Sequence, residues 1–157
     1  MNIDIIAPGK IKEKYFKDAL EEYSKRLSAF VRLTITEIPD ERIPDGASEK
    51  QLEKIKETEG EKILSKIRGG AVVAMCIEGR EYSSEELAGF LEKTAASSSR
   101  ITFIIGGSLG LSEAVKNRAD IRMSFGRITL PHQLMRVVLT EQIYRGYKII
   151  NNHSYHK

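Results

Sequence analysis

Two apolar runs constrain the fold of this 157-residue chain more than any other feature of its sequence. Residues 71–77 read AVVAMCI and residues 101–105 read ITFII, and a glycine-containing segment follows each run. A continuous apolar run of this length is typical of a strand inside a parallel sheet whose two faces are both covered by helices. The sequence therefore predicts an α/β fold in three layers, with a mainly parallel sheet in the middle.

The segments around these runs alternate between strand and helix patterns. We expect strands at residues 2–7, 31–38, 71–77, 101–105 and 121–125, and helices at 14–28, 48–67, 83–95, 112–118 and 132–150. Capping boxes begin two of the helices, at Ser48 with Gln51 and at Ser83 with Glu86. Residues 78–80 are expected to form a turn. Because the chain shows no internal repeat, low-complexity tract or linker, residues 1–157 are expected to form a single domain.

The last predicted helix, residues 132–150, is apolar around most of its girth. Its apolar residues are Leu134, Met135, Val137, Val138, Leu139, Ile143, Tyr144, Tyr147, Ile149 and Ile150. A helix of this kind is buried on most of its sides, which is more than one stripe facing a sheet requires. We expect it to pack against the sheet and also against a twofold-related copy of the chain, which predicts a homodimer.

The composition indicates a compartment but no specific partner. Cys76 is the single cysteine and lies in an apolar run, so we expect a small buried side chain in a reducing compartment. The first residues lack the pattern of a signal peptide, and no apolar stretch reaches the length of a transmembrane helix. These features predict a cytoplasmic protein without membrane contact.

The basic residues are distributed unevenly, although the net charge is only +3. Lys10, Lys12, Lys14 and Lys17 crowd the first loop and helix, and no acidic residue follows Glu141, whereas basic and aromatic residues do. Basic residues mixed with aromatic ones suit contacts with phosphates and stacked bases. A solvated surface and a frayed tail explain the same pattern, so charge alone leaves nucleic-acid binding open.

Two loops have the character of a ligand site. Residues 106–110, GGSLG, follow one apolar run, and residues 124–131, SFGRITLP, lead into the last helix. Glycine lets a ligand approach bare backbone, and crevices at the carboxyl ends of strands are where open α/β sheets bind small molecules. The Walker A and dinucleotide signatures are both missing. An ordinary tight turn explains the first loop taken alone, whereas the two loops together predict a crevice for a nucleoside-sized ligand.

Four segments carry a resemblance to a known family: GKIKEKYFKDALEEYSKRL, FIIGGSLGL, SFGRITLPHQLMRVVLTEQIYRGYKI and the terminal YHK. They resemble the bacterial RlmH family, SPOUT-class methyltransferases that modify N3 of a pseudouridine in 23S rRNA, and the resemblance covers the whole chain. It implies a C-terminal trefoil knot in the α/β fold, an obligate homodimer and S-adenosylmethionine as methyl donor. It also implies action on helix 69 of the large subunit within the assembled 70S ribosome. Chain-topology rules alone make a knot improbable.

The resemblance also implies which residues bind the cofactor. They lie at the end of one strand and in the two loops: Met75, Gly106, Phe125, Gly126, Arg127, Ile128, Thr129 and Leu130. We expect the backbone of the second loop to recognise the adenine, with Ile128 and Leu130 on either side of the ring. The side chain of Arg127 is not expected to be decisive.

Methyl transfer from a sulfonium requires alignment of the acceptor and removal of a weakly acidic proton. No cluster in the sequence has metal-ligand spacing, so no metal is expected. We expect the tail to fold over the target base in the cofactor site of the partner subunit, where Tyr155 stacks on or hydrogen-bonds the base and His156 orients it or takes the proton. The alternative is that the tail only packs on the dimer. His132 is more simply explained as a residue that hydrogen-bonds locally at the start of a helix.

Four basic residues are candidates for RNA binding: Arg136, Arg145, His153 and Lys157. The two arginines either bind phosphate or pair with Glu141 across helix turns, and the sequence does not separate these alternatives. Two competing hypotheses concern the whole chain. One is a non-catalytic RNA-binding module of the ribosome, and the other is a nucleotide-dependent enzyme of another class, which the missing nucleotide signatures disfavour.

Overall fold

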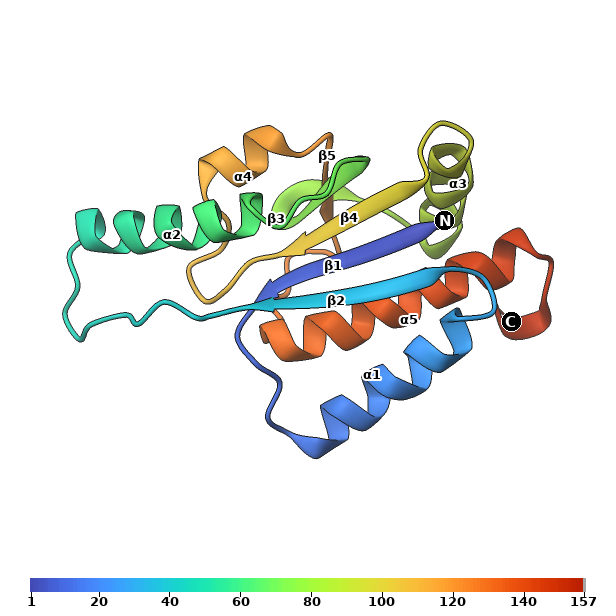
Figure 1. The fold of residues 1–157 in the computed structure, drawn as a ribbon, viewed down its shortest axis with the longest axis horizontal. Helices are drawn as coiled ribbons and strands as arrows, with labels where there is room; N and C mark the ends of the chain where they lie inside the picture. The colour runs from blue at the N-terminus through green and yellow to red at the C-terminus, as the bar shows by residue number, and fades with distance from the viewer. Residues whose placement is uncertain (157) are drawn as a thin grey trace.

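The computed structural model describes residues 1–156, without the side chain of His156. A five-stranded sheet lies between helices that cover its two faces (Figure 1). The elements in chain order are β1 (Asn2–Pro8), α1 (Lys14–Leu27), β2 (Arg32–Ile38), α2 (Glu49–Leu64), β3 (Ala71–Glu81), α3 (Ser84–Ala95), β4 (Arg100–Ile105), α4 (Glu113–Arg118), β5 (Ile121–Ser124), α5 (His132–Ile150) and the 3-10 turn η1 (Ser154–His156). The predicted strands and helices are all present in the predicted order.

The sheet has the strand order β2-β1-β4-β3-β5, and every pair of neighbours is parallel. The two apolar runs form β3 and β4, which lie inside the sheet, and residues 101–105 and 72–75 are buried. This confirms the predicted α/β class and the parallel sheet. Because all strands point the same way, their carboxyl ends and the loops that follow them meet at one edge.

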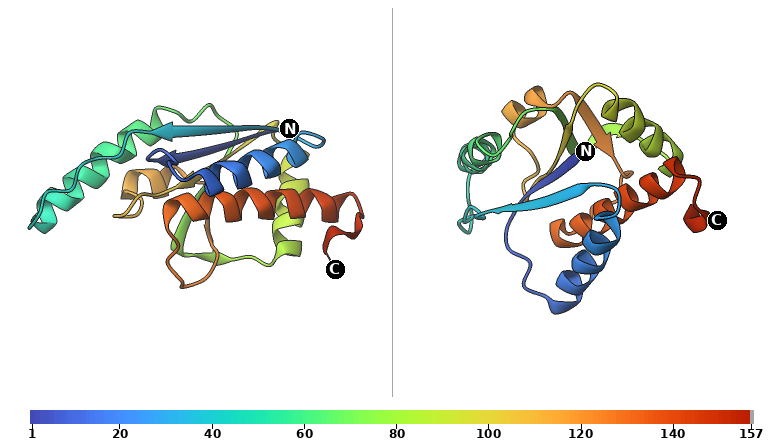
Figure 2. Two further views of the ribbon diagram at one scale, coloured as in Figure 1. Left: turned by 90° about the horizontal axis from the view of Figure 1, so that it is seen from below. Right: turned by 45° about the vertical axis from the view of Figure 1, so that its right-hand side comes forward.

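Two apolar cores lie on opposite faces of the sheet. One joins the sheet to α1, α3 and α5 through residues such as Leu27, Leu91 and Ile143. The other joins it to α2 and α4 through Ile63 and Val115. Figure 2 shows α2 and α4 on one side of β1 and β2, with α1 and α5 on the other. The predicted three layers are therefore present.

Capping boxes fix the starts of α2 and α3, as the sequence predicted. The backbone N–H of Gln51 donates to Ser48 Oγ at 3.2 Å, and the backbone N–H of Ser48 donates to Gln51 Oε1 at 2.8 Å. Ser83 and Glu86 make the same reciprocal pair at α3. Each pair satisfies two backbone groups that the start of a helix otherwise leaves without partners.

The prediction of a turn at residues 78–80 was wrong, because β3 continues through these residues to Glu81. The pairing of β3 with β5 shifts register between Met75 and Arg80, which bulges the strand without ending it. At Gly79 a Cβ atom would lie 2.7 Å from backbone atoms of Arg122 and Met123, so only glycine permits so close an approach of β5. Here glycine serves contact between strands, whereas the sequence pattern suggested a turn.

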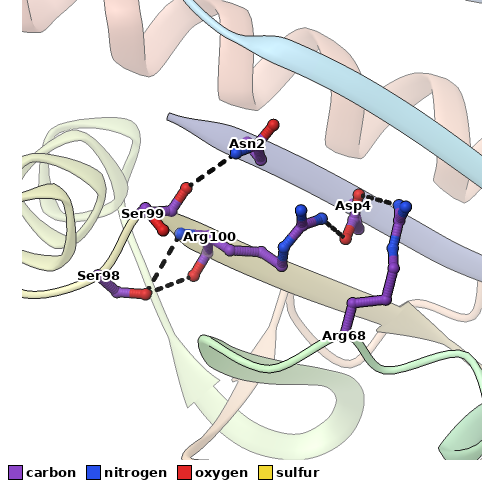
Figure 3. Close-up of polar contacts among 6 residues, drawn as sticks. All are labelled: Asn2, Asp4, Arg68, Ser98, Ser99 and Arg100. Carbon is purple, nitrogen blue, oxygen red and sulfur yellow. Dashed lines mark hydrogen bonds and ion pairs between the residues drawn. The ribbon is translucent and has the colours of Figure 1, made fainter.

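A buried carboxylate closes the opposite edge of the sheet, where the strands begin (Figure 3). Asp4 on β1 has a side chain only 4% exposed, and it pairs with Arg68 at 2.9 Å and with Arg100. Asn2 and Ser98 make further hydrogen bonds around the start of β4. These contacts tie β1 and β4 to the end of α2, far from the loops that follow the strands.

Helix α5 has the predicted bounds, and each of its residues is either buried or half-buried. Arg136, Leu139, Ile143 and Tyr147 are among its buried residues. A second group of apolar side chains stays half-buried along the helix: Leu134, Val137, Val138, Ile149 and Ile150. Across residues 1–156, no helix is both long enough and apolar enough to cross a membrane.

Candidate active site

A cleft of about 820 Å³ opens at the edge of the sheet where β3, β4 and β5 end. Its walls are the end of β3, the glycine loop (residues 106–111), the second loop (residues 124–131) and the first turn of α5. These loops are far apart in sequence but meet here because their strands are parallel neighbours. The volume lies within the range of roughly 300–1,000 Å³ that is usual for small-molecule sites.

The glycine loop is folded tightly upon itself. The backbone N–H of Gly110 donates to the carbonyl oxygen of Gly107 at 3.0 Å, and Gly110 has a φ of +78°. A Cβ atom on Gly106 would lie 2.9 Å from the carbonyl carbon of Gly110 and 3.1 Å from the backbone nitrogen of Leu111. The loop therefore presents main chain to the cleft, and Gly106 has no room for a side chain.

The second loop is held by one serine. Ser124 Oγ donates to the carbonyl oxygen of Gly126 at 3.1 Å and accepts from the backbone N–H of Gly126 at 3.0 Å. Gly126 has a φ of +104°, a region that other residues rarely adopt. Ile128 projects from this loop with 79% of its surface exposed. An apolar side chain so exposed beside a cleft is suited to cover an apolar ligand.

The structure brings most of the expected cofactor residues together. Those that line the cleft are Met75, Gly106, Phe125, Gly126, Ile128, Thr129 and Leu130. Arg127 belongs to the same loop but is exposed and does not line the cleft, which agrees with the minor role expected of its side chain. The cleft is thus the predicted crevice in position and size, while the role of each residue stays a prediction.

One wall of the cleft carries side chains that sequence reasoning missed. Lys56, Cys76, Glu78 and Lys116 all line it. Lys116 pairs with Glu78, and this contact raises the pKa of the Lys116 ammonium and lowers that of the Glu78 carboxyl. Cys76 is half-buried on the cleft wall, which corrects the expectation of a buried core residue, and burial raises the pKa of its thiol. The continuation of β3 past Ile77, which the sequence did not signal, places Glu78 here, whereas Lys56 and Lys116 come from α2 and α4.

Glu59 on α2 supports the glycine loop from behind. Its side chain is 9% exposed and accepts hydrogen bonds from the backbone N–H groups of Gly107 and Glu41. Burial raises the pKa of this carboxyl, and the nearby carboxylates of Asp40 and Glu41 act in the same direction. A glutamate in a helix rich in charged residues is usually solvated, so this contact could not be predicted from the sequence.

Replacing Glu59 with glutamine is expected to change how stability depends on pH. The pKa of Glu59 is higher in the folded than in the unfolded state. Its contribution to the free energy of unfolding is therefore complete below its unfolded-state pKa and is lost as pH rises through its folded-state pKa. The free energy of unfolding of the wild type should therefore fall relative to that of Glu59→Gln as pH rises above the unfolded glutamate value of about 4.3. Urea unfolding across this range measures the difference, with Glu57→Gln on the exposed face of the same helix as control. Parallel profiles for wild type and Glu59→Gln would contradict the assignment.

His132 begins α5 and lines the cleft. Burial lowers the pKa of its imidazole, and the positive charge of Arg136 lowers it further. The ring is therefore neutral at physiological pH and does not add positive charge to the cleft. No group of three or more histidine, cysteine or acidic side chains within the described residues is placed to hold a metal ion.

Arg136 does not have the role expected of it. Its side chain is fully buried, bonds Glu37 Oε1 at 3.0 Å and donates to the carbonyl oxygens of Pro8 and, at 2.8 Å, Gly9. A guanidinium in this position cannot reach RNA, and its partner is not Glu141. A buried charge needs such partners, and here they tie α5 to the end of β1.

The tail folds back along α5 and packs against residues near the middle of the helix. The Tyr155 hydroxyl donates to Glu141 Oε1 at 3.3 Å, and its ring meets that of Tyr144 edge-on at 4.9 Å. Burial, followed by the charge of Glu141, raises the pKa of Tyr155 to about 12, so the phenol is neutral. Arg145 pairs with Glu141 at 2.7 Å, as one of the two sequence alternatives expected.

The remaining tail residues lie beside or beyond this packing. His153 is exposed, with its ring 6.1 Å from that of Phe30. The side chain of His156 and the whole of Lys157 lie outside the described residues, so their expected roles stay predictions. Glu141, which Tyr155 contacts, lies nine residues or about 14 Å along α5 from His132 at the cleft. Tyr155 does not line the cleft of its own chain.

Comparisons with known proteins agree with this arrangement. The model of a family described as predicted SPOUT methyltransferases matches residues 1–156. A protein of Listeria monocytogenes serotype 4b named ribosomal RNA large subunit methyltransferase H is 52% identical over 159 aligned residues, with all of both chains covered. The protein of the same name from Clostridium beijerinckii is 53% identical with the same coverage.

Solved structures share the fold at low sequence identity. A tRNA (m1G37) methyltransferase from Aquifex aeolicus superposes with a TM-score of 0.53 at 14% identity, covering 92% of this chain and 70% of that one. A methyltransferase from Legionella pneumophila, solved with bound S-adenosylmethionine, gives 0.50 at 10% identity, covering 94% and 66%. With its full-length match to the family model and its full-length similarity to the two named proteins, the chain belongs to the SPOUT methyltransferase family, in the group of ribosomal RNA large subunit methyltransferase H.

Proposed function

We propose that this protein transfers a methyl group from S-adenosylmethionine to ribosomal RNA of the large subunit. The backbone-lined cleft between the two loops supports this most directly, in a chain 52% identical over its full length to a ribosomal RNA large subunit methyltransferase H. We further propose N3 of a pseudouridine in helix 69 as the acceptor, within the assembled 70S ribosome. The resemblance to the RlmH family supports this finer assignment.

The cleft fits S-adenosylmethionine in size and chemistry. Its volume suits an adenosine with a short tail, and Met75, Leu130 and the exposed Ile128 offer apolar surface to a flat ring. Main-chain N–H and C=O groups of the second loop offer the hydrogen bonds that distinguish an adenine from other rings. Glycine at position 106 lets the glycine loop close tightly, because a Cβ atom there would press on the main chain of Gly110 and Leu111. When bound, the cofactor supplies a methyl group on a positively charged sulfur.

The protein's own residues have to position the acceptor nitrogen and remove its proton. The neutral imidazole of His132 and the neutral phenol of Tyr155 add no positive charge that would repel the sulfonium. A phenol with a pKa of about 12 is a hydrogen-bond donor rather than a base at neutral pH. We therefore assign Tyr155 to stacking on or hydrogen-bonding the target base, and His156 to orienting that base or accepting its proton.

The working unit is proposed to be a homodimer. The half-buried apolar side chains of α5, Leu134, Val137 and Val138 among them, are suited to pack against a second copy. The position of the tail also favours it, because Tyr155 does not line the cleft of its own chain. In a dimer, Tyr155 and His156 act in the cleft of the other chain. In this arrangement Arg145, His153 and Lys157 lie near the RNA bound at the partner's cleft.

We also propose that residues 1–157 act as one domain and that its C-terminal part forms a trefoil knot. The path of the chain favours a knot, since β4 is followed by β5 on the far side of β3 and α5 then returns to pack between α1 and α3. Such crossings bring the glycine loop and the second loop together at one cleft.

The direct test is mass spectrometry of ribosomal RNA from cells with and without this gene. One methyl group on a pseudouridine of the large subunit should be missing when the gene is deleted and should return when it is restored. Calorimetry with the purified protein provides the second arm, and S-adenosylmethionine should bind at micromolar concentrations. Binding of the cofactor without any missing methyl would redirect the search to another acceptor. Absence of both would leave a non-catalytic RNA-binding module.

A further inference from the structure

The loop after β1 carries two lysines beside the cleft. This basic loop, residues 9–13, holds Lys10 and Lys12, both exposed, and neither forms an ion pair with any carboxylate of the described residues. Ile11 between them is only 7% exposed. The alternation turns both lysines outward while the loop stays anchored to the protein.

A buried charge network fixes the backbone of this loop. Arg136 holds the carbonyl oxygens of Pro8 and Gly9, and its partner Glu37 accepts from the backbone N–H of Ile11 at 3.1 Å. Glu37 Oε1 also bonds the Arg136 guanidinium, so one carboxylate oxygen joins α5 to the basic loop. Burying an arginine completely is unfavourable unless it is paired, and here the two terminal nitrogens of Arg136 are paired with groups that hold a lysine-bearing loop in place.

The loop is next to the cleft in space. At Gly107 of the glycine loop a Cβ atom would lie 3.2 Å from Pro8, the residue that begins the turn into the basic loop. Arg136 lies one turn after His132, and its neighbour Met135 also lines the cleft. Figure 1 shows the segment between β1 and α1 passing the start of α5.

We propose that Lys10 and Lys12 form a docking surface for the phosphate backbone of the RNA that enters the cleft, and that Arg136 is the residue that positions it. This rests on the ribosomal RNA substrate proposed above. Two unpaired cations on a rigid loop match a polyanion in charge, and a fixed loop loses little freedom when the complex forms. Residues 10–18 contain four lysines against two acidic residues, Glu13 and Asp18, so the surroundings reinforce the positive potential.

The test compares Lys10→Gln/Lys12→Gln with Lys66→Gln/Lys93→Gln. The second pair removes the same charge from exposed lysines at the opposite edge of the sheet. Binding to purified ribosomes is measured across a series of salt concentrations, alongside calorimetry with S-adenosylmethionine and methyl transfer to the same ribosomes. Glutamine removes the charge, keeps a polar side chain and needs no rearrangement of an exposed loop.

The loop variant should bind ribosomes several-fold more weakly at low salt. Its plot of log affinity against log salt should be shallower by about 1 for each lysine that contacts a phosphate, with cofactor affinity unchanged. The control pair should keep the wild-type slope. An unchanged slope in the loop variant, an equal effect in the control pair, or a loss of cofactor affinity would each overturn the docking surface. Wild-type protein that binds ribosomes with this salt dependence but transfers no methyl would refute the proposed activity and leave the surface standing.

Discussion

Gly106→Val is expected to abolish binding of S-adenosylmethionine while the chain stays folded. The first added carbon would lie 2.9 Å from the carbonyl carbon of Gly110 and 3.1 Å from the nitrogen of Leu111. Both are main-chain atoms of a closed turn, so neither can move aside as a flexible side chain does. The glycine loop has to open, and the backbone wall of the cleft is lost with it. We expect affinity measured by calorimetry to fall at least about a hundredfold, which is about 2.7 kcal/mol.

Two controls distinguish a specific loss of cofactor binding from a general loss of folded structure. Gly89→Ala changes a glycine of α3 that has nothing within 4 Å of a new Cβ atom, so it should leave cofactor affinity as it is. Thermal melting and sedimentation of Gly106→Val should show a folded protein in the same oligomeric state as the wild type. Unchanged affinity in Gly106→Val would place the cofactor elsewhere on the molecule.

Removal of residues 151–157 is expected to leave cofactor binding intact and to impair methyl transfer. Cofactor affinity should survive, because no described residue of the tail lines the cleft of its own chain. Methyl transfer to ribosomes should fall by about 10²–10⁴, the usual contribution of a positioned acid or base. Single-turnover assays on purified ribosomes measure the transfer, with the cofactor at saturating concentration.

The deletion also removes the packing contact of Tyr155 with Tyr144, so a milder variant is needed to separate packing from catalysis. Tyr155→Phe retains the ring and loses only the hydroxyl that donates to Glu141. If the hydroxyl bonds the target base, transfer should fall while the melting temperature changes little. Full activity in the deletion variant would remove the tail from the mechanism and favour the alternative that it only packs on the dimer.

The sequence predicted the sheet well because the physics that forms strands is local. The runs that became β3 and β4 are apolar on both faces, and this pattern has few explanations other than an interior parallel strand. The capping boxes at Ser48 and Ser83 likewise involve residues only three positions apart. The crevice followed from combining two such local signals, since glycine-bearing loops after parallel strands must emerge at one edge.

What the sequence did not reveal depends on contacts between distant residues. Gly79 reads as a turn, and only the backbone of β5 packed against it shows why it is glycine. Arg136 and Glu37 are 99 positions apart, so no spacing rule connects them. Glu59 appears to belong to a solvated helix face until the glycine loop is folded over it. Each of these residues acts through a partner that the fold, not the local pattern, provides.

The length of α5 has a consequence for mixtures of defective chains. One end of this helix builds the wall of a cleft and the other carries the tail, so a chain damaged at one end is intact at the other. In the proposed dimer, a Gly106→Val subunit paired with a tail-deleted subunit has one intact cleft facing one intact tail. Neither variant should work by itself, yet co-expression should restore part of the activity through complementation between subunits. Genetic rescue of this kind reports the exchange of tails without any knowledge of the dimer's geometry.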